Sequence, residues 1–107
     1  MGKDRVIKTI GKLIGGMTAH KILIKYNLTP KSDNHLRAKA QTYGGQIEDN
    51  LEEYHWNNYD REKIKIEAQK SLRKELKKKH FIGVKFPNNE KNILLNETFN
   101  EFFDISI

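Results

Sequence analysis

The sequence contains no cysteine, and this absence excludes disulfide bonds, thiol nucleophiles and cysteine-ligated metal sites. Small secreted domains often depend on disulfide bonds, so a cysteine-free chain of this size is typical of a reducing compartment, and we expect a cytoplasmic location. Long apolar runs are also lacking, because Lys8, Lys12 and Lys21 interrupt the most hydrophobic stretch. No stretch has the length of a membrane span or the pattern of a signal peptide, so we expect no membrane association.

Apolar residues make up 36% of the 107-residue chain, and charged residues make up 32%. That proportion allows one modest core, and the length fits one domain spanning residues 1–107. The apolar residues nevertheless recur every three or four positions, which is the spacing of an amphipathic helix. This periodicity predicts a folded helical domain and argues against disorder.

The first helical segment, at residues 3–27, has an apolar face but also contains three glycines that weaken a helix, namely Gly11, Gly15 and Gly16. Residues 21–26 at its end fit either a continuation of the helix or a short strand. We favour the helix.

Two further long helices are predicted at residues 33–54 and 59–79, each with apolar residues along one narrow face. The turn between them, at Asn57-Asn58, is short, so we expect these two helices to be antiparallel neighbours. An apolar segment at residues 81–86 fits a short strand or a loop. The last segment is predicted to be a short helix that places four apolar side chains on one face: Leu95, Phe99, Phe102 and Phe103.

These segments together predict an all-α fold, a small antiparallel helical bundle of three longer helices plus a short C-terminal helix. One minor strand pair is left open as an alternative for residues 21–26 and 81–86. The aromatic C-terminal segment and the small apolar fraction also suggest a homodimer whose subunits share a core.

The net charge is +6, and its sign alternates along the chain. Residues 1–31 and 61–91 are strongly basic, whereas residues 32–60 and 92–107 are acidic. In an antiparallel bundle this pattern places opposite charges on neighbouring helices, so part of the basic charge is expected to be neutralised internally.

The densest basic cluster lies toward the end of the third predicted helix and consists of Lys70, Arg73, Lys74, Lys77, Lys78 and Lys79. A row of cations can follow a phosphate backbone, and Trp56, at one end of the same helix pair, can stack on a base. We therefore predict RNA or DNA binding as the leading function. The alternative for the same charges is a solvated face of a non-catalytic protein–protein interaction module.

Arg73 and His80 are seven residues apart, a spacing that returns a helical side chain to nearly the same direction. An arginine that holds a phosphate beside a histidine that transfers a proton is a minimal set for RNA cleavage. The spacing resembles the Arg-x(4–6)-His signature of the HEPN superfamily, small helical bundles that often dimerise to form a ribonuclease site. The resemblance covers eight residues, and Lys74 stands where that family often has an uncharged polar or acidic residue. It implies a metal-independent ribonuclease with Arg73 as phosphate clamp and His80 as acid or base.

The four histidines do not form a metal-binding pattern. Glu52 and His55 form a single Glu-x-x-His pair, whereas a di-iron bundle needs that pair twice. We therefore expect neither a metal nor a cofactor.

Overall fold

The computed structural model describes residues 2–26, 33–78, 81 and 84–103 of the chain. Within these residues the fold consists of four helices: α1 (Gly2–Tyr26), α2 (Asp33–Leu51), α3 (Asn58–Leu76) and α4 (Glu90–Phe102). The predicted all-α fold of three longer helices plus a short C-terminal helix is confirmed, and no strand occurs in the described ranges. None of the helices in this part of the chain combines the length and the apolarity that crossing a membrane requires.

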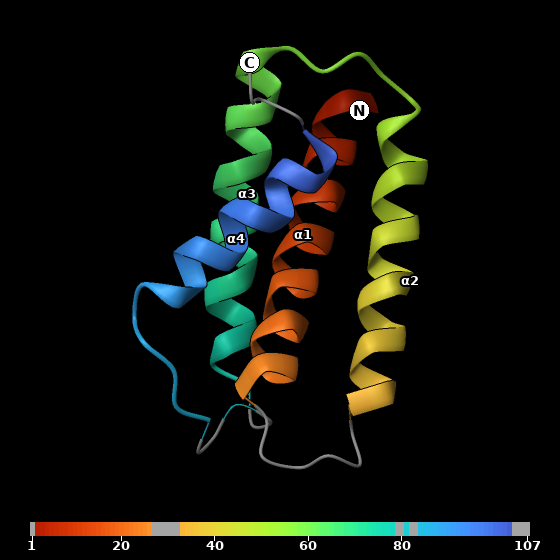
Figure 1. The fold of residues 1–107 in the computed structure, drawn as a ribbon. Coiled ribbons are helices and arrows are strands. Elements are labelled where there is room, and N and C mark those ends of the chain that lie inside the picture. The colour runs from red at the N-terminus through yellow and green to blue at the C-terminus, as the bar shows by residue number, and fades with distance from the viewer. Residues whose placement is uncertain (1, 27–32, 79–80, 82–83, 104–107) are drawn as a thin grey trace.

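Helix α1 lies at the centre of the molecule. Figure 1 shows α2 on one side of α1, α3 on the other side, and α4 crossing obliquely over α3 and α1. Helix α1 makes the most extensive contacts, first with α3 and α2 and then with α4. A helix of 25 residues is about 37 Å long, so α1 alone spans most of the 40 Å longest dimension of the molecule. Helices α1 and α3 run in the same direction, and α2 runs antiparallel to both (Figure 1).

The expectation that the second and third helices are neighbours was wrong, because α1 lies between them and they share no substantial contact. The physical reason is the length of their connection. Helix α2 ends at Leu51 rather than at Tyr54, so residues 52–57 are free to cross the end of the bundle. A segment of six residues reaches at most about 20 Å, so this connection can pass over a helix about 10 Å in diameter even though Glu52 and Glu53 still form a turn at the end of α2.

Helices α1 and α3 approach each other closely where glycines of α1 meet small residues of α3. A Cβ atom at Gly15 would lie 2.6 Å from the Cβ of Ser71 and 2.8 Å from the carbonyl oxygen of Ala68. A Cβ atom at Gly11 would likewise lie 3.1 Å from the backbone nitrogen of Ala68. At the same contact the hydroxyl of Ser71 donates a hydrogen bond to the carbonyl oxygen of Lys12 at 3.2 Å. The backbone of α3 can come this close only because these positions of α1 carry no side chain.

The core lies between α1 and the faces that the other three helices turn toward it. Its largest fully buried apolar side chains come from all four helices and are Ile10, Ile14, Ile22, Ile47, Ile64 and Leu95. Two threonines are also fully buried, Thr18 and Thr98, and each hydroxyl donates to the carbonyl oxygen four residues earlier at 2.8 Å. Their polar atoms are therefore satisfied, and the core tolerates them.

Residues 21–26 continue α1, which confirms the helical interpretation of this segment. Ile22 and Leu23 are buried and Ile24 is half-buried, so this part of the helix is covered from several sides and loses a clean amphipathic pattern. In the other ambiguous segment, Phe81 is buried and residues 84–86 have no regular structure. Residues 82 and 83 lie outside the described ranges.

Opposite charges hold α4 against α1. Lys25 Nζ lies 2.5 Å from Glu90 Oε1, and Lys21 forms a second ion pair with Glu101. The hydrogen bond from Lys25 to Glu90 raises the pKa of Lys25 above its ordinary value. Acidic side chains of α4 thus neutralise part of the basic charge of α1, as the alternation of charge along the sequence suggested.

The aromatic side chains at the end of α4 belong to the core of this chain. Phe99 and Phe103 are each 3% exposed, and their ring centroids are 4.7 Å apart. Because these rings are already buried within one subunit, they give no argument for a core shared between two. The homodimer stays a prediction.

Substitutions of two helical glycines test the close contact between α1 and α3. We expect Gly15→Ala to lower the free energy of unfolding by about 1–3 kcal/mol, because the new methyl group would overlap Ser71 and the backbone of α3. Gly45→Ala is the matched control, because a Cβ at Gly45 meets nothing within 4 Å, and it should raise that free energy by up to about 1 kcal/mol. Urea unfolding monitored by circular dichroism measures both. Equal effects of the two substitutions would contradict the close contact.

Candidate functional site

A groove with a volume of about 420 Å³ lies between α2 and α3, with α1 as its floor. Its lining residues are Lys12, Leu13 and Gly16 of α1, Tyr43 of α2, Glu67, Lys70, Ser71, Lys74 and Glu75 of α3, and Lys78 just after the end of α3. The lysines that bind α4, Lys21 and Lys25, each lie nine residues after a lining residue of α1, which corresponds to a half turn about the helix axis. The groove is therefore on the side of α1 that α4 leaves uncovered.

The groove carries a surplus of positive charge, with four lysines and two glutamates in its lining. Lys78 Nζ donates a hydrogen bond to Glu75 at 2.8 Å, which raises the pKa of Lys78, and Lys70 lies 3.8 Å from Glu67. Within the described part of the chain, the other two lysines of the groove, Lys12 and Lys74, form no ion pair. Two cations from two different helices are thus available to an anionic ligand.

Tyr43 forms the α2 wall of the groove and is packed against α1. A Cβ at Gly16 would lie 3.1–3.3 Å from three atoms of the Tyr43 ring, so this glycine lets the ring sit directly on the helix backbone. The Tyr43 ring also contacts His20, with 5.2 Å between ring centroids. His20 Nδ1 in turn donates to the carbonyl oxygen of Gly16 at 2.9 Å. These contacts fix an aromatic ring beside the lysines.

A second hollow, of about 310 Å³, continues the basic surface toward the N-terminus of α1. It is lined by Asp4, Ile7, Lys8, Lys63, Ile66 and Glu67, and it shares Glu67 with the groove. Lys63 lies 3.8 Å from Asp4, which is 82% exposed, so this ion pair is a weak one. The line along which α1 and α3 meet therefore presents lysines along most of its length.

The structure does not keep the predicted basic cluster together on one surface. Lys70, Lys74 and Lys78 lie in the groove. Arg73 lies on the side of α3 that faces α4. Lys77 is exposed at the end of α3, and Lys79 lies outside the described residues.

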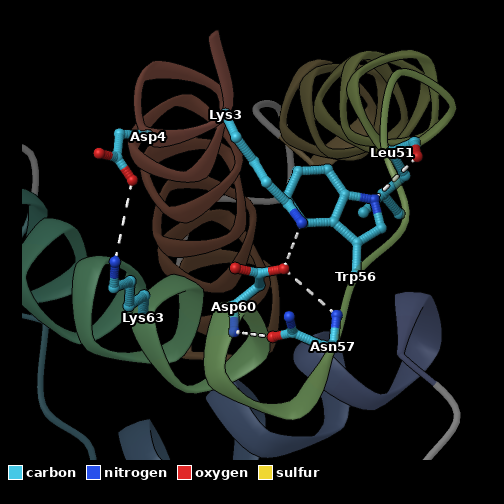
Figure 2. Close-up of polar contacts among 7 residues, drawn as sticks. All are labelled: Lys3, Asp4, Leu51, Trp56, Asn57, Asp60 and Lys63. Carbon is cyan, nitrogen blue, oxygen red and sulfur yellow. Dashed lines mark hydrogen bonds and ion pairs between the residues drawn. The ribbon is translucent and has the colours of Figure 1, made fainter. Parts of the chain in front are cut away.

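Trp56 does not lie with these lysines, because it sits next to the start of α3 at the other end of the bundle. Its indole Nε1 donates a hydrogen bond to the carbonyl oxygen of Leu51 (Figure 2); the two atoms are 2.8 Å apart, and Lys3 Nζ lies 5.5 Å from the ring centroid. Lys74 is sixteen residues beyond the first residue of α3, which is about 24 Å along the helix axis. The aromatic ring that does line the groove belongs to Tyr43 of α2.

Asp60 connects the start of α3 to α1, as Figure 2 shows. Its backbone N–H donates to Asn57 Oδ1 at 2.8 Å, and the N–H of Asn57 donates to Asp60 Oδ2 at 3.3 Å, which forms a capping box. The same carboxylate lies 2.5 Å from Lys3 Nζ. This cluster explains the positions of Lys3 and Trp56 as structural contacts at the end of the bundle.

The acidic side chains of α2 and of the segment after it do not neutralise the groove. Glu48, Asp49, Glu52 and Glu53 are exposed, and none of them lines it. Among the described residues none of the four forms an ion pair. The lysines of α3 therefore stay accessible to a ligand, because the acidic helix is on the far side of α1.

No group of three or more histidine and carboxylate side chains in the described ranges is close enough to hold a metal ion. No family model, curated protein or solved structure matches this chain. The similarity of Arg73 and His80 to the HEPN signature is thus confined to that spacing. Since His80 lies outside the described residues, the ribonuclease hypothesis stays a prediction.

The capping box predicts how stability depends on pH. The hydrogen bond from Lys3, and that from the Asn57 N–H, hold the pKa of Asp60 below its ordinary value of 3.8. A carboxylate whose pKa is lower in the folded state contributes its full stabilisation above the ordinary pKa and loses it as the pH falls through the lowered one. We therefore expect the difference in unfolding free energy between the wild type and Asp60→Asn to be largest near neutral pH and to shrink below about pH 4.

Urea unfolding at a series of pH values measures this difference. Asp4→Asn is the control, because Asp4 is 82% exposed and pairs only weakly with Lys63, so its substitution should change stability little at any pH. A difference for Asp60→Asn that does not vary with pH would show that the carboxylate is not held by Lys3.

Proposed function

We propose that this chain binds a single strand of RNA or DNA in the groove between α2 and α3. The observation that carries the proposal is the pair Lys12 and Lys74, which line one groove from two helices and form no ion pair within the described residues. A cation without a partner can bind a phosphate without first giving up another interaction. The two remaining lysines of the groove are exposed and paired with glutamates, and exposed pairs of this kind contribute little and exchange readily.

The spacing of the lysines suits a chain of phosphates better than one small anion. Lys70 and Lys74 are four residues apart in α3, so they lie about 6 Å apart along its axis, and Lys78 follows four residues later, just after the helix ends. This is similar to the separation of neighbouring phosphates in a nucleic acid strand. Lys8 and Lys63, in the adjoining hollow, extend the same basic track toward the N-terminus of α1. Grooves of single-strand binders follow the backbone in this manner.

Two features favour a single strand over a duplex. The groove has a volume of about 420 Å³, which accommodates part of one nucleic acid strand but is too small to enclose a double helix. Tyr43 also presents an aromatic ring beside the lysines, and an aromatic ring can stack on an unpaired base of any identity. Binding is therefore expected to depend on charge and strandedness rather than on sequence.

Removing the two unpaired lysines tests the proposal. We expect the double substitution Lys12→Gln with Lys74→Gln to weaken binding of a fluorescently labelled oligothymidine or oligouridine. It should also reduce the slope of log affinity against log salt by about 0.7 for each phosphate that the variant no longer neutralises. Fluorescence anisotropy titrations at several salt concentrations measure both quantities.

The single substitutions Lys12→Gln and Lys74→Gln should each weaken binding as well. Lys85→Gln is their matched control, because Lys85 is exposed and lines neither the groove nor the adjoining hollow. It removes the same charge and should leave the affinity and the salt dependence nearly unchanged. An unlabelled single strand should displace the probe better than a duplex of the same length. The absence of any binding at low salt, or equal effects of Lys74→Gln and Lys85→Gln, would refute the proposal.

A further inference from the structure

Two basic side chains, Arg73 of α3 and Lys91 of α4, line a separate cavity on the other side of α3. This cavity has a volume of about 250 Å³ and lies between α3 and α4. Its lining residues are Gln69, Leu72 and Arg73 of α3 and Lys91, Asn92 and Leu95 of α4. None of them lines the groove between α2 and α3, so the two sites are distinct. We propose that this cavity binds a phosphate monoester between Arg73 and Lys91.

The lining of the cavity offers hydrogen-bond donors from both helices and no carboxylate. Arg73 and Gln69 project from α3, and Lys91 and Asn92 project from α4. In the described ranges, neither Arg73 nor Lys91 forms an ion pair. The groove, by contrast, contains two glutamates that compete for its lysines. The cavity therefore holds two neighbouring positive charges with no negative charge in its lining to balance them.

The floor of the cavity is apolar. Leu72 is 3% exposed and Leu95 is 2% exposed, so both leucines belong to the core beneath the charged rim. An apolar floor excludes water from one side of a bound anion, and charge-assisted hydrogen bonds become stronger when less water competes for them. A single anion held by two cations over such a floor would be bound more firmly than one on a flat lysine surface.

The donor set suits a terminal phosphate better than a carboxylate. A guanidinium group can donate two parallel hydrogen bonds to two phosphate oxygens, whereas the ammonium group of Lys91 acts as a point charge. A phosphate monoester carries nearly two negative charges at neutral pH and has three terminal oxygens, which matches two cations and flanking amide donors. The ligand would be either the terminal phosphate of a nucleic acid strand or a free mononucleotide, which share this chemistry.

Nuclear magnetic resonance titrations test the proposal directly. Inorganic phosphate is the first probe, and the side-chain amide signals of Gln69 and Asn92 should shift on its addition. We expect Arg73→Gln and Lys91→Gln each to weaken phosphate binding about tenfold or more, because each removes a charge-assisted hydrogen bond. Arg73→Lys should retain part of the affinity, since it keeps the charge but cannot bind two oxygens at once.

Two controls separate this site from general electrostatic attraction and from the groove. Lys85→Gln removes one charge elsewhere and should leave phosphate binding unchanged, and so should the double substitution of Lys12 and Lys74. Equal weakening by Lys85→Gln and Arg73→Gln, or no shift of the Gln69 and Asn92 signals, would overturn the proposal. Failure of the single-strand proposal would not affect this result, because it concerns other residues.

The source of the phosphate is then distinguished with two further probes. An oligothymidine with a 5′-phosphate should bind more tightly than the same strand with a 5′-hydroxyl if the ligand is a strand end, and Arg73→Gln should abolish that difference. Adenosine monophosphate should bind as well as the phosphorylated strand if the ligand is a free nucleotide. Arg73→Gln should weaken either ligand, and a phosphate group that adds no affinity in either probe would contradict the proposal.

Discussion

The close packing of α1 on α3 through glycine is the constraint on which the rest of the structure depends. Gly11 and Gly15 bring the backbone of α3 against α1 at Ala68 and Ser71. That close approach makes α1 the centre of the molecule instead of one corner of a bundle. The other helices then pack around α1, with α2 on its second side and α4 on its third. The remaining side of α1 is left without a helix, and the groove forms there.

The distribution of charge follows from the same arrangement. The C-terminal half of α1 faces α4, where Lys21 and Lys25 pair with glutamates. In the N-terminal half Lys3 pairs with an aspartate, whereas Lys8 and Lys12 face the open side and form no ion pair within the described residues. The most acidic part of the chain cannot reach the lysines of α3, because α1 separates the two helices. The positive charge therefore stays unbalanced where α1 and α3 meet.

The periodicity of apolar residues was enough to predict the helices, because each helix buries one face against the core. The order of the helices in space was not predictable from a turn signal. Asn57 was interpreted as part of a short turn, whereas it caps α3 at the end of a six-residue connection. The spacing of Asn57 and Asp60 is a capping box and was the available signal for the start of α3. A sequence prediction that ended α2 at Leu51 would have shown that the connection is long enough to cross α1.

The candidate site was only partly accessible to sequence reasoning, and the reason is geometric. The groove lysines of α3 are four residues apart and could be grouped from the sequence, whereas Lys12 and Tyr43 join them only because α1 lies between α2 and α3. Gly15 allows α3 to approach one side of α1, and Gly16, the next residue, allows the ring of Tyr43 to lie on the adjacent side. A helix that carried side chains at both positions would hold α2 and α3 further away and would fill the space between them. The glycines that weaken α1 as an isolated helix are therefore the residues that create the groove, which is the surface proposed to bind a single strand of RNA or DNA.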